Sequence, residues 1–220
     1  MTFSILARDP DSNAIGGAAA TGSLCVGGWV LRGDLRAGMS ASQGLSPSTF
    51  WGEDVLTAMG AGQSAKQAVD AVTSADAGRA QRQLAALGLR GEGAVFSGDQ
   101  NLPAIGARLF PGGISAGNML TKASVVDAMT EAYLGARGTF AARLLAALRE
   151  AQTAGGDTRG LLSAALLILS PDHAPLTLRI DYHEDPLQAL EALHVRATTG
   201  DYAEWCRQVP TMSDPERGCD

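Results

Sequence analysis

Basic residues and cysteines are both scarce in this chain, and each shortage excludes a class of protein. The 220 residues include 17 Lys and Arg against 23 Asp and Glu, which gives a net charge of −6. Nucleic acids and anionic membranes are bound by clustered basic residues, so neither is an expected partner. The three cysteines lie far apart without C-x-x-C or Cys/His spacing. We therefore predict neither a disulfide framework nor a structural metal site.

Long apolar runs are also lacking. The most apolar stretch, residues 161–169, reaches about half of the roughly 20 residues that a membrane-spanning helix needs. The first residues do not follow the pattern of a secretory signal, since no basic segment precedes a long apolar one. We expect a cytoplasmic protein. Its 45% hydrophobic residues suffice for a core of its own.

Strands and helices are predicted in blocks along the chain. Alternating or continuous apolar segments between turn residues predict strands at 2–7, 14–20, 36–44, 82–88, 93–97, 104–109, 114–118, 161–169 and 176–182. Helical periodicity and capping residues predict helices at 51–59, 64–73, 124–134, 139–154, 185–197 and 202–209. This order favours an α+β protein with layered, mainly antiparallel sheets and outer helices. We expect a main domain over 1–185 and a C-terminal helical extension over 186–220, with a loose tail after Pro210.

Thr2 is the first candidate for chemistry. A residue this small after Met1 generally allows an aminopeptidase to remove the methionine, which leaves an α-amino group and a hydroxyl on the same residue. The amine has a reference pKa of about 7.7–8.0 and is therefore able to act as a base near neutral pH. A hydroxyl with a base in reach is an activated nucleophile. The apolar strand predicted directly after Thr2 would hold this chain end in place.

Several segments resemble a known family. They are TFSILARDP at 2–10, GISAGNML at 113–120, AARLLAAL at 141–148, AGGDTRG at 154–160, SAAL at 163–166 and RIDYHEDP at 179–186. Over roughly residues 2–193 the chain resembles domain-of-unknown-function family 1028, which is placed in the N-terminal nucleophile (Ntn) hydrolase superfamily. The resemblance implies a four-layer αββα sandwich, in which helices flank two stacked sheets. It also implies hydrolysis of an amide or related bond, but not a particular substrate. Our leading hypothesis is a hydrolase that acts through Thr2 on a small-molecule, amide-like substrate and requires no metal or organic cofactor. A homo-oligomer is expected by analogy with the superfamily.

Five further residues are candidates for this site. Asn118 is expected in a strand-to-helix turn, where its amide would point at a developing oxyanion. Asp157 and Arg159 would fix the amine or bind a substrate carboxylate, or would pair with each other and hold their loop. Gln43 and Ser23 would line the substrate pocket, or would make local hydrogen bonds only.

Two other functions remain open from the sequence. Apolar residues near Gln43 and at Ala116 and Leu162 favour a ligand-binding or oligomer-forming protein without catalysis. The segment 113–117 matches the G-x-S-x-G elbow of a serine hydrolase, with Ser115 as nucleophile. A metal site near Asp181 and His183 is less expected than a helix cap at this point.

Overall fold

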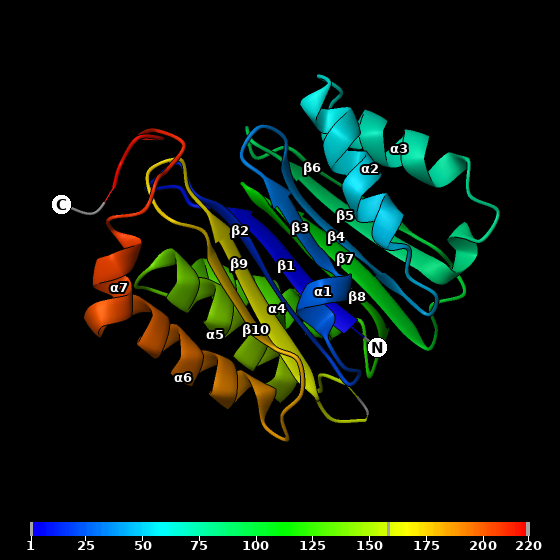
Figure 1. Ribbon diagram of the computed structural model, residues 1–220. Helices are drawn as coiled ribbons and strands as arrows, with labels where there is room; N and C mark the ends of the chain where they lie inside the picture. The colour runs from blue at the N-terminus through cyan, green and yellow to red at the C-terminus, as the bar shows by residue number, and fades with distance from the viewer. Residues whose placement is uncertain (1, 158, 219–220) are drawn as a thin grey trace.

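The structure is a computed structural model that describes residues 2–157 and 159–218. The expected removal of Met1 therefore concerns a residue outside the described part. Two antiparallel sheets form the centre of the molecule, and helices lie on the outer face of each (Figure 1). This mixed α+β arrangement is compatible with the expected sandwich.

The larger sheet has six strands in the order β10-β9-β2-β1-β8-β7, and every neighbouring pair is antiparallel. Its strands are β1 (Thr2–Arg8), β2 (Ile15–Thr21), β7 (Ala104–Phe110), β8 (Gly113–Leu120), β9 (Ser163–Leu169) and β10 (Leu176–Ile180). The first strand of the chain is therefore central in this sheet, with hydrogen-bonded neighbours on both sides. This pairing fixes the beginning of the described chain, where ends without such partners fray.

The smaller sheet has four antiparallel strands in the order β3-β4-β5-β6. They are β3 (Leu31–Asp34), β4 (Gly38–Gly44), β5 (Arg82–Gly88) and β6 (Gly93–Ser97). Glycine is needed at Gly38, because its φ is +136° and an added Cβ would lie 2.1 Å from the Leu87 carbonyl oxygen. Strand β4 can therefore pair closely with β5 at this point.

The described residues form seven α-helices and one short 3₁₀ helix (Arg79–Gln81). The α-helices are α1 (Val26–Trp29), α2 (Thr49–Gly60), α3 (Ala65–Ser74), α4 (Ser124–Gly135), α5 (Phe140–Thr153), α6 (Pro186–Thr198) and α7 (Gly200–Cys206). Helices α2 and α3 cover the smaller sheet, and α4 to α6 lie on the far side of the larger one (Figure 1). Ser64 and Asp185 cap α3 and α6 with their side chains, as the sequence predicts.

Three hydrophobic clusters fill the spaces between these layers. One joins the larger sheet to α4, α5 and α6, the second lies between the two sheets, and the third joins the smaller sheet to α2 and α3. Alternate side chains of β1 belong to two of these clusters, since Phe3 and Ile5 face the helices while Leu6 faces the other sheet. One apolar strand can therefore be covered on both faces, and its side chains are fixed from both directions.

Two parts of the chain differ from the expectation. Residues 26–34 form α1 and β3 rather than a loop, and Cys25 begins α1 in the left-handed region with a φ of 62°. The segment after Pro210, expected to be loose, is attached by hydrogen bonds: the Ser213 N–H donates to the Pro171 carbonyl and its hydroxyl to Asp172. In the described residues, no helix combines the length and the apolar character needed to cross a bilayer.

Candidate active site

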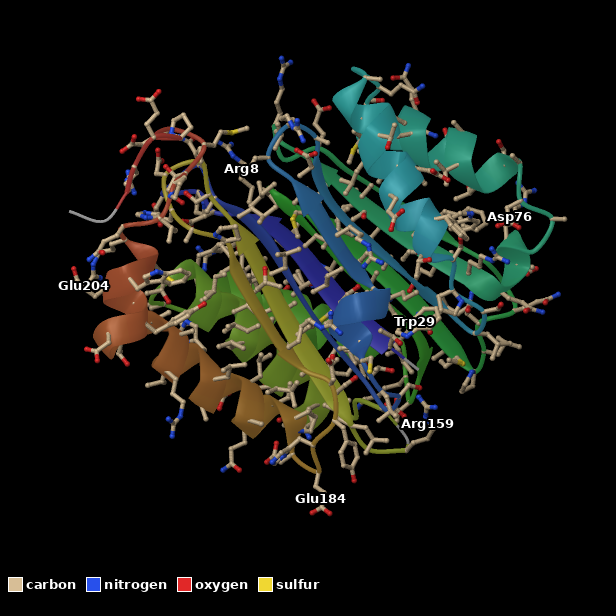
Figure 2. All side chains as sticks on the ribbon, viewed as in Figure 1. Arg8, Trp29, Asp76, Arg159, Glu184 and Glu204 are labelled. Atoms are coloured by element: carbon tan, nitrogen blue, oxygen red, sulfur yellow. The ribbon has the colours of Figure 1, made fainter. Side chains whose placement is uncertain are left out.

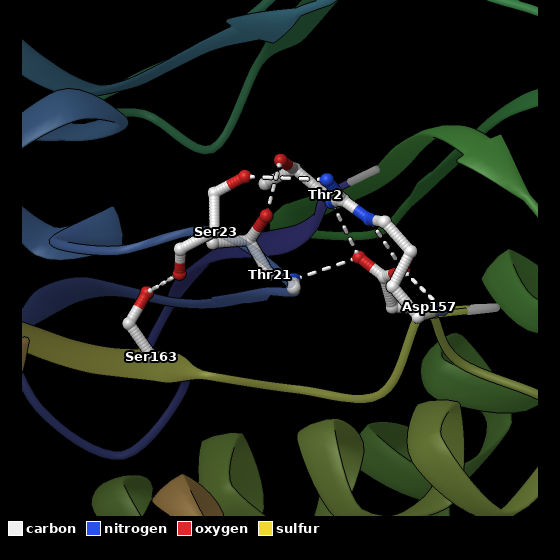
Figure 3. Close-up of polar contacts among 7 residues, drawn as sticks. Thr2, Thr21, Ser23, Asp157 and Ser163 are labelled. Carbon is white, nitrogen blue, oxygen red and sulfur yellow. Dashed lines mark hydrogen bonds and ion pairs between the residues drawn. The ribbon is translucent and has the colours of Figure 1, made fainter. Parts of the chain in front are cut away.

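Thr2 lies at the beginning of β1, with its side chain toward the space between the two sheets. The residue is only 8% exposed, and its hydroxyl donates a hydrogen bond of 3.1 Å to the Thr21 hydroxyl. Thr21 is directly opposite Thr2 at the end of β2. Pairing of β1 on both edges thus holds a hydroxyl at a fixed position at the end of the sheet (Figure 3).

The loop after β2 is anchored to β9 next to this threonine pair. The Ser163 hydroxyl donates to the Ser23 carbonyl at 2.7 Å and accepts from the Val26 N–H at 3.1 Å. The Ser23 side chain itself faces Arg159, with 3.5 Å between the Ser23 Oγ and the Arg159 Nη1. Ser163 therefore fixes the loop that places Ser23 beside Thr2.

Asp157 and Arg159 form an ion pair on the other side of Thr2. The distances are 3.1 Å from Nε to Oδ1 and 2.9 Å from Nη2 to Oδ2. The Asp157 carboxylate is fully buried, whereas the Arg159 side chain is 50% exposed. Burial alone would raise the pKa of Asp157, but hydrogen bonds from Arg159 and from the Gly22 N–H outweigh it and lower the pKa. The carboxylate therefore stays charged at neutral pH.

Gly22 allows the carboxylate to approach the backbone this closely. Its N–H lies 2.7 Å from Asp157 Oδ2, and a Cβ at position 22 would lie 2.5 Å from that oxygen and 2.5 Å from the Gly160 carbonyl oxygen. Any larger residue would separate the two loops. Glycine at this position thus links the loop after β2 to the loop before β9.

A chain of buried amides lies behind Thr2. The Ser4 hydroxyl donates to Gln43 Oε1 at 2.8 Å, and Gln43 Nε2 donates to Gln83 Oε1 at 2.7 Å. Gln83 Nε2 donates to two backbone carbonyls, of Gly106 and Gly117, at 3.1 and 3.2 Å. Because carbonyls can only accept, they fix the orientation of the Gln83 amide.

Asn118 is oriented by this network. It is fully buried and its Nδ2 donates to Gln83 Oε1 at 3.3 Å, while its Oδ1 has no hydrogen-bond partner among the described residues. It lies opposite Thr2 within β8, not in the turn that the sequence predicts. The expected turn is therefore wrong, whereas no contact of the described residues tests the expected role at an oxyanion.

A cleft of about 550 Å³ opens over these groups. Its lining includes Thr2, Ser23, Gln43 and Arg159, four of the six residues that the sequence selects. The other two lie behind the lining: Asp157 is hydrogen-bonded to Arg159, and Asn118 is the residue paired with Thr2 in the β-ladder. Trp29 lies at the same end of the molecule as Arg159 (Figure 2).

The backbone around the cleft is strained at two positions. Cys25 and Met119 have φ angles of 62° and 53°, and they are the non-glycine residues with positive φ in the described part of the chain. Met119 lines the cleft, and Cys25 lies between the lining residues Leu24 and Val26. Such conformations are costly and concentrate at functional sites. Their position is an independent reason to regard this cleft as the site.

Ser115 does not have the geometry of a serine-hydrolase elbow. It lies inside β8, paired with Ile5 and Arg108 on its two sides, and it has no exposed surface. An elbow serine must be exposed at a strand-to-helix turn. The match to G-x-S-x-G is therefore a coincidence of a glycine-rich strand.

The segment after β10 is occupied by local contacts. Asp181 pairs with Arg179, and His183 Nδ1 accepts a hydrogen bond from the Asp185 N–H. Over residues 2–157 and 159–218, no three His, Cys, Asp or Glu side chains come together in a way that would hold a metal ion. The expected helix cap at Asp185 is confirmed.

The described residues form an α+β protein with two antiparallel sheets. Its candidate active site is the cleft above Thr2, the first residue of the central strand β1. Residues 2–190 match the model of the "Family of unknown function (DUF1028)", and the chain belongs to this family. The crystal structure of protein SPO2555 from Silicibacter pomeroyi, also described by the DUF1028 model, is similar, with a TM-score of 0.96 and 61% sequence identity. The alignment covers 100% of this chain and 96% of that one. No curated protein matches the chain.

Proposed function

We propose that the protein is an Ntn-type hydrolase that cleaves a small amide-like bond through Thr2 after removal of Met1. The observation that carries the proposal is the position of the Thr2 hydroxyl, which is held at the end of a central strand and lines a cleft. Few chain ends are fixed in this way, and a nucleophile must be fixed to react efficiently. The proposal includes the finer description of the fold as an Ntn-hydrolase-like αββα sandwich.

The reaction would begin with the freed amine of Thr2. The amine takes the hydroxyl proton as Oγ1 attacks the substrate carbonyl, and the tetrahedral intermediate collapses when the leaving nitrogen receives that proton. Water, activated by the same amine, then attacks the acyl ester and restores the Thr2 hydroxyl. Backbone N–H groups at the cleft would stabilise the oxyanion.

Asn118 and Asp157 would act on the amine rather than on the substrate. The Asn118 Oδ1 has no partner among the described residues and belongs to the residue paired with Thr2 in the β-ladder. It would accept a hydrogen bond from the amine and direct its lone pair toward Oγ1. The charged, buried Asp157 would stabilise the ammonium form that arises during the proton transfer.

Mass spectrometry and a substrate screen test the proposal together. The purified native protein should have the mass of the chain without Met1. Among small amides and lactams, at least one should be hydrolysed by the wild type. Turnover should fall at least about a thousandfold in Thr2→Ala and be partly retained in Thr2→Ser, which keeps a hydroxyl.

Two results would refute this function. A native protein that keeps Met1 has no free amine on Thr2, and the mechanism cannot operate. Equal turnover by wild type and Thr2→Ala would show that another residue reacts. Amides that bind with no hydrolysis in any condition would instead support a binding protein, which the apolar residues around the cleft favour.

A further inference from the structure

The cleft over Thr2 is polar at one end and apolar along its sides. Thr2, Thr21 and Ser23 form the polar end. Four large apolar side chains along the lining are more than half exposed: Leu24 is 54% exposed, Trp29 51%, Leu45 56% and Leu102 64%. We call these four residues the apolar rim.

The apolar rim is built from three separate parts of the chain. Leu24 and Trp29 flank or belong to α1, Leu45 follows β4, and Leu102 follows β6. No single amphipathic element accounts for them, because each segment contributes its own exposed side chain to the same cleft. A gathering of exposed apolar side chains around a concave site is typical of a ligand-binding surface.

The charges of the described side chains at the cleft cancel. Arg159 is the charged residue of the lining, and the buried Asp157 carboxylate pairs with it through two hydrogen bonds. A carboxylate ligand would therefore meet a guanidinium whose charge the Asp157 carboxylate already balances. An ammonium ligand would find no acidic side chain among the described residues of the lining. The electrostatics favour a ligand without charge.

From these observations we infer that the substrate is an uncharged amide with a hydrocarbon arm, alkyl or aryl. The amide lies at Thr2, and the arm lies along the apolar rim. This inference rests on the proposed hydrolase function only in calling the ligand a substrate. The binding itself does not require turnover. The volume of about 550 Å³ lies in the range of sites for small organic ligands.

Binding to the full-length Thr2→Ala variant tests the inference without catalysis. Calorimetric titration with butanamide, hexanamide and octanamide should give a dissociation constant that falls by up to roughly fourfold for each added methylene. Octanoate and octylammonium should bind more weakly than octanamide. Trp29 emission should shift to shorter wavelength with octanamide, and Trp29→Phe should lose that shift.

Variants of the apolar rim supply the control. Leu24→Ser and Leu102→Ser should weaken octanamide binding at least fivefold and butanamide binding by a smaller factor. Leu109→Ser changes a leucine that is 53% exposed on β7, outside the cleft lining, and should have no effect. Sedimentation of each variant checks its oligomeric state.

Three results would overturn the inference: affinity independent of chain length, preference for octanoate, or rim variants that change the oligomeric state with unchanged affinity. The last would assign the apolar rim to contact with a second copy of the chain. Chain-length-dependent binding without any wild-type turnover would support the inference about the ligand and refute the hydrolase. Turnover without chain-length dependence of binding would support the hydrolase and refute the inference about the ligand.

Discussion

Thr2 and Asn118 are paired across the ladder between β1 and β8, and the Asn118 amide nitrogen is directed to Gln83. The orientation of an asparagine next to the candidate nucleophile is thus set by a glutamine on the other sheet. Gln83 in turn is fixed by two backbone carbonyls. The two sheets are therefore coupled through polar contacts directly behind the site.

Removing the Gln83 amide should destabilise the protein. Gln83→Leu would remove the hydrogen bonds that this side chain makes with the Gln43 and Asn118 amide nitrogens and with two backbone carbonyls, and buried polar groups that lose partners are costly. We expect the free energy of unfolding in urea to fall by about 2–4 kcal/mol. Gln100→Leu, on the surface, should cost less than about 0.5 kcal/mol. Equal effects of the two variants would contradict the network.

Asp157→Asn should lower stability in a pH-dependent way. The pKa of Asp157 is below its ordinary value in the folded protein, so the carboxylate stabilises the fold above the unfolded pKa of about 3.9. This contribution is lost as the pH falls through the lower, folded pKa. We expect a cost of about 1–2 kcal/mol at pH 7, because Arg159 is half exposed and water screens the pair.

Urea unfolding at several pH values measures this dependence. The difference between wild type and Asp157→Asn should be constant from pH 7 to about pH 5 and should shrink below about pH 4. A difference that persists unchanged at the lowest pH would show that the variant acts through packing rather than charge.

Gly22→Ala should damage the site more than the fold. The new Cβ would collide with Asp157 and with the Gly160 backbone, which separates the two loops on either side of Thr2. We expect a cost of about 1–3 kcal/mol in stability and a lower kcat on any substrate found. The matched control is Gly60→Ala at the end of α2, where the added Cβ makes only an ordinary contact of 3.7 Å with Ala37. Wild-type kcat in Gly22→Ala would contradict the link.

Tyr133→Phe should stabilise the protein. The Tyr133 hydroxyl is buried and has no hydrogen-bond partner among the described residues, while its ring contacts Phe110, Phe140 and Arg143. Phenylalanine would keep the ring contacts and remove the unsatisfied group, for a gain of about 1 kcal/mol at pH 8. Tyr182→Phe, at an exposed tyrosine, should be neutral. A loss of stability in Tyr133→Phe would mean that the hydroxyl has a partner.

The same tyrosine gives a prediction at high pH. Burial raises the pKa of Tyr133 to about 12, so the folded state favours the neutral phenol. Its contribution to stability is complete below the unfolded pKa of about 10 and is lost as the pH approaches the folded value. Wild type should therefore lose stability between pH 10 and 12 more steeply than Tyr133→Phe, as measured by thermal unfolding.

Periodicity and turn residues locate most elements of this fold correctly. The apolar alternation of 2–8 and the capping residues Ser64 and Asp185 are local signals, and the structure confirms them. Residues 26–34 were not predicted, because α1 depends on a left-handed Cys25 and on the Ser163 hydroxyl from a distant strand. Neither this backbone conformation nor this hydrogen bond can be predicted from the local sequence.

The residues of the candidate site also divide into those that local sequence indicates and those that depend on distant contacts. Thr2, Ser23, Gln43 and Arg159 stand next to recognisable motifs, and they meet at one cleft. Gln83 escapes the sequence analysis because a glutamine next to Arg82 at the beginning of a strand resembles a surface position. Its partner is Gln43, directly opposite on β4, and this pairing depends on the register of two strands about 40 residues apart. Gln83 could have been selected only if the sequence indicated how β4 and β5 pair.

The strand order of the larger sheet also bears on how the chain emerges from a ribosome. Strand β1 can pair only with β2 until β8 (Gly113–Leu120) has been translated. The second neighbour of β2, which is β9 (Ser163–Leu169), is translated later still. At about 5–20 residues per second, roughly 6–22 s separate the synthesis of β1 from that of β8. Under the proposed function, Met1 would be removed most readily in this interval, before β8 covers the open edge of β1.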